Sequence, residues 1–231
     1  MPVVIFFACL DLERKSSLIR NFQYVEFRAS LQLECWNIKK LSNRGENMLE
    51  EYPKEITLPD GFVCVLRPMT RDDQDALYRF FISLPEDDRR NLRNDATNRI
   101  LIEKWCRDLN HDRVLPILAE HENRILANAT LHRETFGWGR HIGEIRITVA
   151  SDFQQRGLGS LLLEELSKLA LKFNLDKLCA KIIASRTYVT RAFEKNGFVR
   201  EATLKNFVKI LYDKNYEDIV VLVKDLNKKP G

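Results

Sequence analysis

The sequence predicts an α+β fold, an α/β sandwich in which a mixed, mainly antiparallel sheet is flanked by helices. Three strand-like segments follow one another between residues 114 and 149, with short turns between them. Apolar residues at helical spacing precede this block, and a leucine-rich helix followed by one more strand comes after it. Consecutive strands joined by short turns pair antiparallel, whereas a strand–helix–strand unit gives a parallel pair. The sheet is therefore expected to be mostly antiparallel with one parallel crossover.

A strand and two helices are expected ahead of the central block. From Gly61, alternating apolar residues predict a first strand, which Arg67-Pro68 ends. Thr70 is a suitable cap for a helix with acidic residues in its first turn. That helix keeps apolar residues at helical spacing at Leu77, Phe80, Phe81 and Leu84. A second helix is predicted over Ala96–Leu109.

The remaining elements run almost without interruption to the end of the chain. The central strands are expected at Val114–Glu120, Arg124–Arg133 and His141–Val149. The leucine-rich helix should span about Gly157–Phe173. After it the sequence predicts a buried strand at Lys177–Ile183, a helix over Arg186–Asn196 ended by Gly197, and strands at Phe198–Val208 and Tyr216–Val223.

The first 47 residues differ from the rest because they carry neither a sustained period nor a motif. Met48 stands just before the patterned region. We expect residues 1–47 to be an extension outside the fold, arising from the choice of start codon, and residues 48–231 to form the domain. The alternative is a short helix or strand docked on the domain.

Bulk composition excludes several classes of protein. The chain has 37 basic and 33 acidic residues, and a net charge of +4 is too small to indicate a nucleic-acid partner. The five cysteines form no C-x-x-C, and the four histidines lack metal-ligand spacing, so we expect no metal. The apolar run at residues 3–10 is far too short to span a bilayer. We therefore expect a cytoplasmic protein without a membrane partner.

A glycine-bearing loop, Gln154-Gln155-Arg156-Gly157-Leu158-Gly159, is the most informative segment for function. Glycines let a backbone approach a ligand closely, and the first turn of a helix has unpaired N–H groups. Together they make a site for a phosphate or pyrophosphate. Neither the P-loop motif nor the full dinucleotide fingerprint is present, so those two nucleotide sites are unsupported.

The pattern Q-x-x-G-x-G after a strand ending at Val149-Ala150 resembles the coenzyme A loop of the GNAT superfamily of N-acetyltransferases. A second block, residues 191–198 ending in N-G-F, resembles the helix-to-strand segment of that family, and the separation of the two blocks also fits. The resemblance covers residues 56–226. It implies acetyl-CoA as cosubstrate and an amine as acceptor, and a homodimer is possible.

The resemblance also implies which residues hold the cosubstrate. The strand segment should offer backbone groups to the pantetheine arm, and the loop should hold the pyrophosphate through N–H groups, with added charge from Arg156. A bulge near Val149 is expected to open the acetyl site and turn the Val149 N–H toward the thioester oxygen. The implied residues are Ile147, Thr148, Val149, Gln154, Gln155, Arg156, Gly157, Leu158, Gly159 and Ser160.

Proton transfer is less clearly encoded. Glu144, on the strand before the loop, is the candidate general base, and the alternative is a structural ion pair with Arg146 on the same face. Many relatives have a tyrosine acid where this chain has Phe193, and an asparagine where it has Arg186. His132 and His141 titrate near the useful range, although a surface role suits each of them better.

Two functions remain open from the sequence. The first is acetyl transfer from acetyl-CoA to a primary amine, and the second is a non-catalytic acetyl-CoA-binding sensor, which Phe193 keeps open. The acceptor is not encoded in a readable pattern. The expected acceptor segments, Ser83–Asn94 and Asn206–Tyr216, both mix acidic and basic residues.

Overall fold

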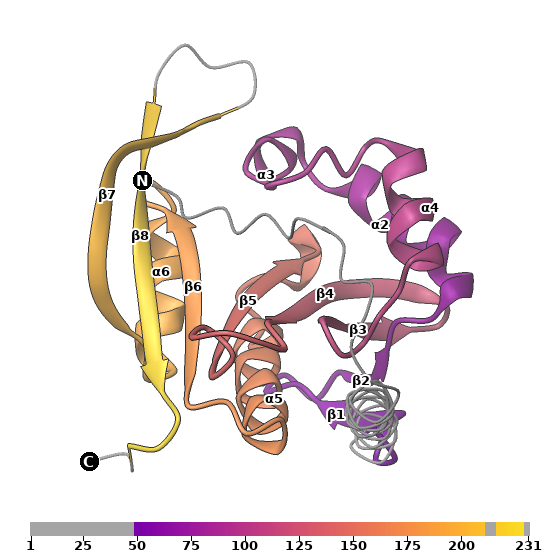
Figure 1. Cartoon of the computed structure of the whole chain (residues 1–231). Coiled ribbons are helices and arrows are strands. Elements are labelled where there is room, and N and C mark those ends of the chain that lie inside the picture. The colour runs from indigo at the N-terminus through magenta and orange to yellow at the C-terminus, as the bar shows by residue number, and fades with distance from the viewer. Residues whose placement is uncertain (1–48, 211–215, 229–231) are drawn as a thin grey trace, which may run out of the picture. The chain divides into compact units, whose positions relative to one another are not determined.

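A sheet in the order β1-β2-β3-β4-β5-β6-β8-β7 organises the computed structural model, which describes residues 49–210 and 216–228 (Figure 1). All neighbouring strands pair antiparallel except β5 and β6, which are parallel. The expected mainly antiparallel sheet with one parallel crossover is therefore confirmed. The predicted extension, residues 1–47, lies outside the described residues.

The elements follow the chain in regular order. The strands are β1 Lys54–Thr57, β2 Val63–Pro68, β3 Val114–His121, β4 Arg124–Arg133, β5 Ile142–Val149, β6 Lys177–Ile183, β7 Val199–Lys209 and β8 Tyr216–Asp225. The α-helices are α2 Gln74–Ser83, α3 Glu86–Arg90, α4 Arg99–Arg107, α5 Leu158–Lys172 and α6 Thr187–Lys195, with single 3₁₀ turns η1 Arg71–Asp73 and η2 Ser151–Phe153. Sequence patterns predicted all of these segments except β1, α3 and η2.

The start of the α2–α4 segment is fixed by the predicted cap. The Thr70 hydroxyl accepts from the Asp72 N–H, and the Thr70 N–H donates to the Asp73 carboxylate at 2.7 Å, which makes a capping box. Arg67, at the end of β2, donates to both Asp73 oxygens at 2.6 and 2.8 Å. This partly buried ion pair joins β2 to the helices that follow it.

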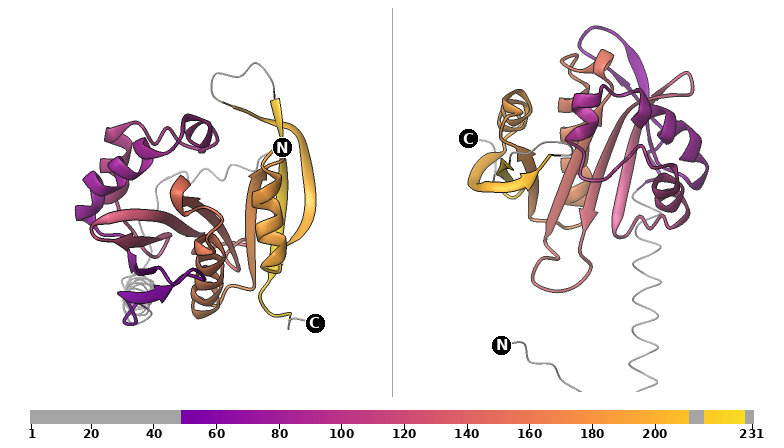
Figure 2. Two further views of the ribbon diagram at one scale, coloured as in Figure 1. Left: turned by 180° about the vertical axis from the view of Figure 1, so that it is seen from behind. Right: turned by 90° about the horizontal axis from the view of Figure 1, so that it is seen from above.

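Helix α5 covers one face of the sheet, where it packs on β4, β5 and β6 and contacts α6 (Figure 2). Its stripe of Leu158, Leu162, Leu166 and Leu169 is fully buried. Gly143 in β5 faces the same side, because a Cβ there would come within 2.7–3.0 Å of the Leu131, Leu175 and Leu178 side chains. Successive residues of a strand alternate in direction, so Glu144 points to the opposite face.

Strands β5 and β6 diverge after a short paired stretch (Figure 1). Their parallel pairing covers only Ile142–Glu144 against Lys177–Cys179, although β5 continues to Val149 and β6 to Ile183. We call the two unpaired stretches, residues 145–149 and 180–183, the β5–β6 fork. The fork arises because β5 follows β4 while β6 follows β8 along its whole length.

The expected bulge near Val149 is wrong. The β4–β5 register runs without a shift from Arg133↔Gly143 to Ala127↔Val149. Divergence of two strands that keep different neighbours opens this edge, without an extra residue in β5.

Candidate active site

The loop before α5 has left-handed residues and backbone N–H groups that lack an acceptor among the described residues. Gln155 has a φ of +60° and Gly157 a φ of +92°, so left-handed residues recur within the loop. Gly157 is also the N-cap residue of α5. Within the described residues, none of the N–H groups from Gln155 to Gly159 donates to a backbone or side-chain acceptor. Consecutive free N–H groups at the positive end of a helix form a concave anion site.

The two glycines of the loop have different surroundings. A Cβ on Gly157 would lie 2.8 Å from the Pro59 ring, and its positive φ strains any other residue. A Cβ on Gly159 would meet no atom within 4 Å. Gly157 therefore maintains the loop conformation, while Gly159 leaves the space in front of the first turn of the helix open.

The side chains of the loop supply little free charge. Arg156 donates to Asp60 at 2.6 Å, and its guanidinium lies 4.4 Å from the centre of the Phe153 ring. The added positive charge expected from Arg156 is therefore offset by Asp60, in the turn between β1 and β2. Leu158 is buried in the core, and the exposed Ser160 hydroxyl accepts from Asn196 at 3.2 Å. An anion in this loop would be held by backbone groups.

The other predicted binding segment forms one edge of the fork. Ile147, Thr148 and Val149 are half-buried, pair with β4, and have no strand partner on the β6 side. The Gln154 amide donates to the Val149 carbonyl at 3.3 Å, which ties the loop to the end of β5. An extended ligand arm can add to such an edge through main-chain hydrogen bonds.

Asp88 in α3 bridges the open end of the fork. Its carboxylate accepts from the Gln154 amide at 3.1 Å and from the Arg186 guanidinium at 2.8 Å. Gln154 follows β5 and Arg186 follows β6, so one carboxylate connects the segments that leave the two diverging strands. Arg186 also donates to the Asp87 carbonyl at 2.6 Å.

Glu144 is surrounded by three cations on the face away from α5. One of its oxygens accepts from Arg93 at 2.6 Å and from Arg146 at 3.0 Å, and the other accepts from Lys181 at 3.2 Å. Burial raises the pKa of Glu144, but the hydrogen bonds from Arg146 and Lys181 and the charge of Arg93 outweigh it, and the net pKa is lowered. The ion pair between Glu144 and Arg146, which was the alternative to a general-base role for Glu144, is present.

Other polar groups share this face. His132 pairs across the strands with Glu144, and its ring nitrogen lies 3.0 Å from the Thr130 hydroxyl. Burial, aided by the charge of Arg146, lowers the pKa of His132 to about 4, so its ring is neutral at pH 7. Asn128 pairs with Thr148, and its buried Oδ1 has no hydrogen-bond partner among the described residues.

No hydroxyl occupies the position of the family's tyrosine acid. Phe193 in α6 is 6% exposed and packs edge-on against Phe198, with ring centres 5.0 Å apart. Tyr188, earlier in the helix, is 47% exposed, and its hydroxyl accepts from Arg186 at 3.0 Å. Its hydroxyl is at the surface, as expected.

Sequence reasoning missed Arg93, Lys181 and Asp88 as members of this region. Arg93 and Asp88 were visible only as parts of a segment of mixed charge, and Lys181 only as a residue of a buried strand. The alternation of β6 carried a usable signal, because Lys181 lies two residues after Cys179, the partner of Glu144. Reading that signal requires the register between β5 and β6.

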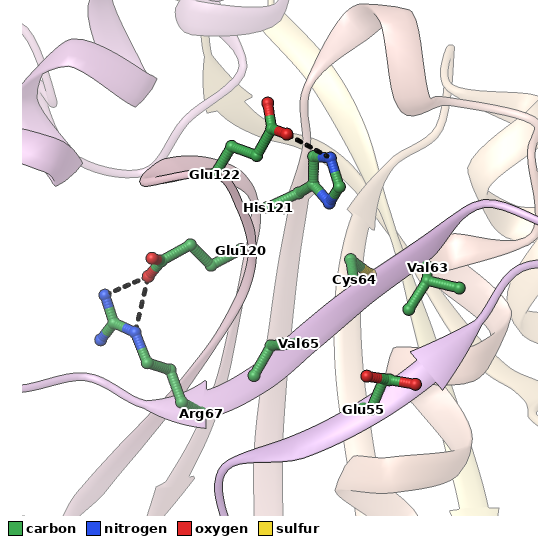
Figure 3. A pocket seen from close by; sticks show the side chains of 8 residues that line it. All are labelled: Glu55, Val63, Cys64, Val65, Arg67, Glu120, His121 and Glu122. Atoms are coloured by element: carbon green, nitrogen blue, oxygen red, sulfur yellow. Dashed lines mark hydrogen bonds and ion pairs between the residues drawn. The ribbon is translucent and has the colours of Figure 1, made fainter.

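A cavity of about 330 Å³ lies on β1, β2 and the β3–β4 turn (Figure 3). None of the predicted site residues lines it. Its one arginine, Arg67, is already paired with Glu120 at 2.5 Å and with Asp73. Among the described residues, no His, Cys, Asp and Glu side chains gather as a metal site, and no helix has the length and apolar character for crossing a membrane.

Solved structures with this fold are numerous. The GNAT domain of S. lividans PAT is 17% identical, with a TM-score of 0.63 over 76% of this chain and 98% of that one. The ribosomal-protein-alanine N-acetyltransferase from Brucella melitensis is 23% identical, with a TM-score of 0.60 over 69% and 98% of the two chains. The protein yncA from Salmonella typhimurium, solved with its cofactor acetyl-CoA, is 16% identical, with a TM-score of 0.60 over 73% and 96%. At these identities the likeness shows the fold.

Comparison of sequences gives the family. No curated protein matches the chain. The model of the acetyltransferase (GNAT) family matches residues 76–198, which run from α2 through the loop to the N-G-F block and make up more than half of the chain. The chain therefore belongs to the GNAT family of acetyltransferases.

Proposed function

We propose that residues 48–231 form an acetyl-CoA-dependent N-acetyltransferase that acts on a primary amine. The observation that carries this proposal is the continuity of two unused sets of backbone groups. The free N–H groups of the loop lie at one end, and the unpaired edge of β5 extends from there along Val149, Thr148 and Ile147. A pyrophosphate joined to an extended arm matches this arrangement.

The reaction requires few protein groups. Acetyl-CoA supplies the thioester, the amine nitrogen attacks its carbonyl carbon, the carbon–sulfur bond breaks, and the thiolate leaves. A thiolate is a good leaving group, so the phenylalanine at position 193 is compatible with turnover. We propose that Glu144 accepts the amine proton, directly or through water. Its lowered pKa keeps it ionised at neutral pH, at the expense of basicity.

Calorimetry with acetyl-CoA tests the binding half of the proposal. Gly159→Trp places a bulky side chain in the open space before α5 and should weaken binding by roughly 10²-fold, because phosphate can no longer approach the N–H groups. Gly139→Trp is the matched control, since its Cβ would also meet no atom within 4 Å but lies in the β4–β5 connection. Equal affinity of the two variants for acetyl-CoA would show that the loop before α5 is not the binding site.

Release of free thiol in the presence of amines tests the catalytic half. A second candidate function, an acetyl-CoA-binding sensor, is favoured by one observation: Phe193 has no proton to donate and is buried against Phe198. Tight acetyl-CoA binding without thiol release from any amine would support the sensor. Turnover with any amine would support the enzyme.

A further inference from the structure

The face of the sheet beside the fork carries an excess of positive charge. Three cations, Arg93, Arg146 and Lys181, converge on the single carboxylate of Glu144, with N···O distances of 2.6, 3.0 and 3.2 Å. The sum of these four charges is +2. No other carboxylate of the described residues forms an ion pair with any of the three cations. The site is therefore set up to receive a second anion.

The three cations also have hydrogen-bond donors to spare. An arginine has five N–H donors and a lysine three. Within the described residues, Arg93 uses only Nη1, Arg146 uses Nε and Nη2, and Lys181 makes one bond, all to Glu144. Their side chains are 40%, 37% and 39% exposed, so a ligand can reach them. An anion could bind here without displacing Glu144.

The position of the cluster relative to the fork connects it with the acceptor. Arg146 and Lys181 each lie two residues beyond the last parallel pair, Glu144↔Cys179, one on each diverging strand. A ligand arm that runs from the loop along the edge of β5 toward this pair therefore ends beside them. The reacting end of the arm is where the acceptor amine must approach. Arg93 reaches the same place from the α3–α4 connection.

We propose that the acceptor is an amine that carries its own carboxylate, as a free amino acid does, and that Arg93, Arg146 and Lys181 bind that carboxylate. This inference rests on the proposed function. A planar carboxylate matches the paired N–H groups of a guanidinium, and hydrogen bonds between charged groups are stronger than neutral ones. A polyamine or other purely cationic acceptor would be repelled by the +2 excess.

The pyrophosphate of the cosubstrate is the alternative anion that these three cations would bind. It has its own backbone site in the loop, which comes after the end of β5, and that end, Val149, lies five strand steps or about 16 Å from Glu144. Experiment can distinguish binding of the acceptor carboxylate from binding of the pyrophosphate. The affinity for acetyl-CoA would depend on Lys181 only if these cations bound the pyrophosphate.

The first test compares each of the twenty amino acids with its α-amide as acceptor, using thiol release by the full chain. The amide has the lower amine pKa and is therefore the more available nucleophile, so a preference for the acid must come from binding. We expect kcat/KM to favour the acid by roughly tenfold or more for the best acceptor. Equal or greater activity with amides or polyamines would overturn the inference while leaving the acetyltransferase function intact.

The second test removes one cation. Lys181→Gln should raise KM for the acid roughly tenfold and KM for the amide much less, so the preference for the acid should fall. Lys177→Gln is the matched control, an exposed lysine on the same face of β6 and four residues earlier, and should change neither value. Acetyl-CoA affinity should be the same in both variants. A loss of that affinity in Lys181→Gln would assign the cluster to the cosubstrate instead.

If no amine is turned over, the proposed function fails, and equilibrium binding decides this inference by itself. Calorimetry of the chain saturated with CoA, titrated with amino acids and their amides, should show binding of an acid that Lys181→Gln weakens. Absence of any preference for acids would overturn the inference.

Discussion

The two proposed anion sites, the loop before α5 and the cluster of Arg93, Arg146 and Lys181 beside the fork, are built by different means. The loop uses consecutive backbone N–H groups of one short segment, residues 155–159. The cluster uses side chains from the α3–α4 connection, β5 and β6, which are far apart in the sequence. A site made by contiguous backbone is visible as a glycine pattern, whereas a site made by converging side chains is visible only after folding. Glu144→Gln and Asp88→Ala test the two sites separately.

The largest effect is expected from Glu144→Gln. If Glu144 accepts the amine proton, its replacement should lower kcat by roughly 10²–10⁴ at neutral pH, with a smaller loss at high pH, where more amine is deprotonated. Removing the competing carboxylate should also lower KM for an acidic acceptor. Acetyl-CoA affinity should not change, because the loop is untouched. A rate near that of the unaltered protein at pH 7 would leave Glu144 as an ion-pair residue.

The pH dependence of the unaltered protein gives an independent check on Glu144. Its pKa is lowered in the folded protein, so the ion pairs stabilise the fold above the unfolded-state pKa, and this stabilisation is lost as the pH falls through the folded-state value. The acid limb of the rate profile should accordingly lie below about pH 4.5. Because the pKa of His132 is also lowered, to about 4, the limb belongs to Glu144 only if it is lost in Glu144→Gln and kept in His132→Gln.

Gly157→Ala should affect stability as well as the loop. The residue has a φ of +92°, and its new Cβ would meet the Pro59 ring at 2.8 Å, so we expect a loss of about 1–2 kcal/mol in the free energy of unfolding. Gly159→Ala, with open space at the Cβ, should change the unfolding free energy by less than about 0.5 kcal/mol. Chemical denaturation measures both. Equal unfolding free energies of the two variants would contradict the different roles assigned to Gly157 and Gly159.

Asp88→Ala removes the bridge between the two ends of the fork. Gln154 and Arg186 then lose their common partner, the loop is less firmly positioned, and KM for acetyl-CoA should rise about three- to tenfold. Glu86→Ala is the control, since Glu86 lies in the same helix and its one ion pair within the described part of the chain is with Arg90 at 2.5 Å. A change in KM for the acceptor alone would place Asp88 with the cation cluster.

The smallest effect is expected from Phe193→Tyr. The ring is buried against Phe198, and thiolate departure needs no dedicated acid, so the rate should change by less than roughly threefold. Thiol release by the full chain, with and without the substitution, measures it. Activity that rises from zero in the variant would favour the sensor.

Most of the fold could be predicted because its elements carry strong local patterns. The leucine stripe of α5 and the alternation in β2 give these two elements directly. β1 was not predicted because four residues are too few to show a period. α3 was not predicted because its five residues, Glu86–Arg90, are all charged. The bulge near Val149 was wrong because it was taken from the resemblance, while the register is set by pairing with β4.

In the candidate site, too, local features could be predicted from the sequence, whereas contacts between distant residues could not. The loop residues follow from their spacing, and Gly157 has the conformation that only glycine adopts readily. The free charge expected of Arg156 did not follow, because its partner Asp60 lies nearly a hundred residues earlier. The three partners of Glu144 depend in the same way on strand register and on the path of the α3–α4 connection.

The short parallel contact between β5 and β6 has a consequence for cooperativity. Strand pairing joins the block β1–β5 to the block β6–β8–β7 only over Ile142–Glu144 in the described residues, with two further backbone hydrogen bonds to His141, so the sheet is weakest at this boundary. A ligand arm laid along β5 would add hydrogen bonds at the place where the sheet lacks them. Amide exchange at the boundary should then slow when the ligand binds, and the two blocks should unfold more nearly as one unit. Under the proposed function, the bound ligand would complete the sheet at this boundary.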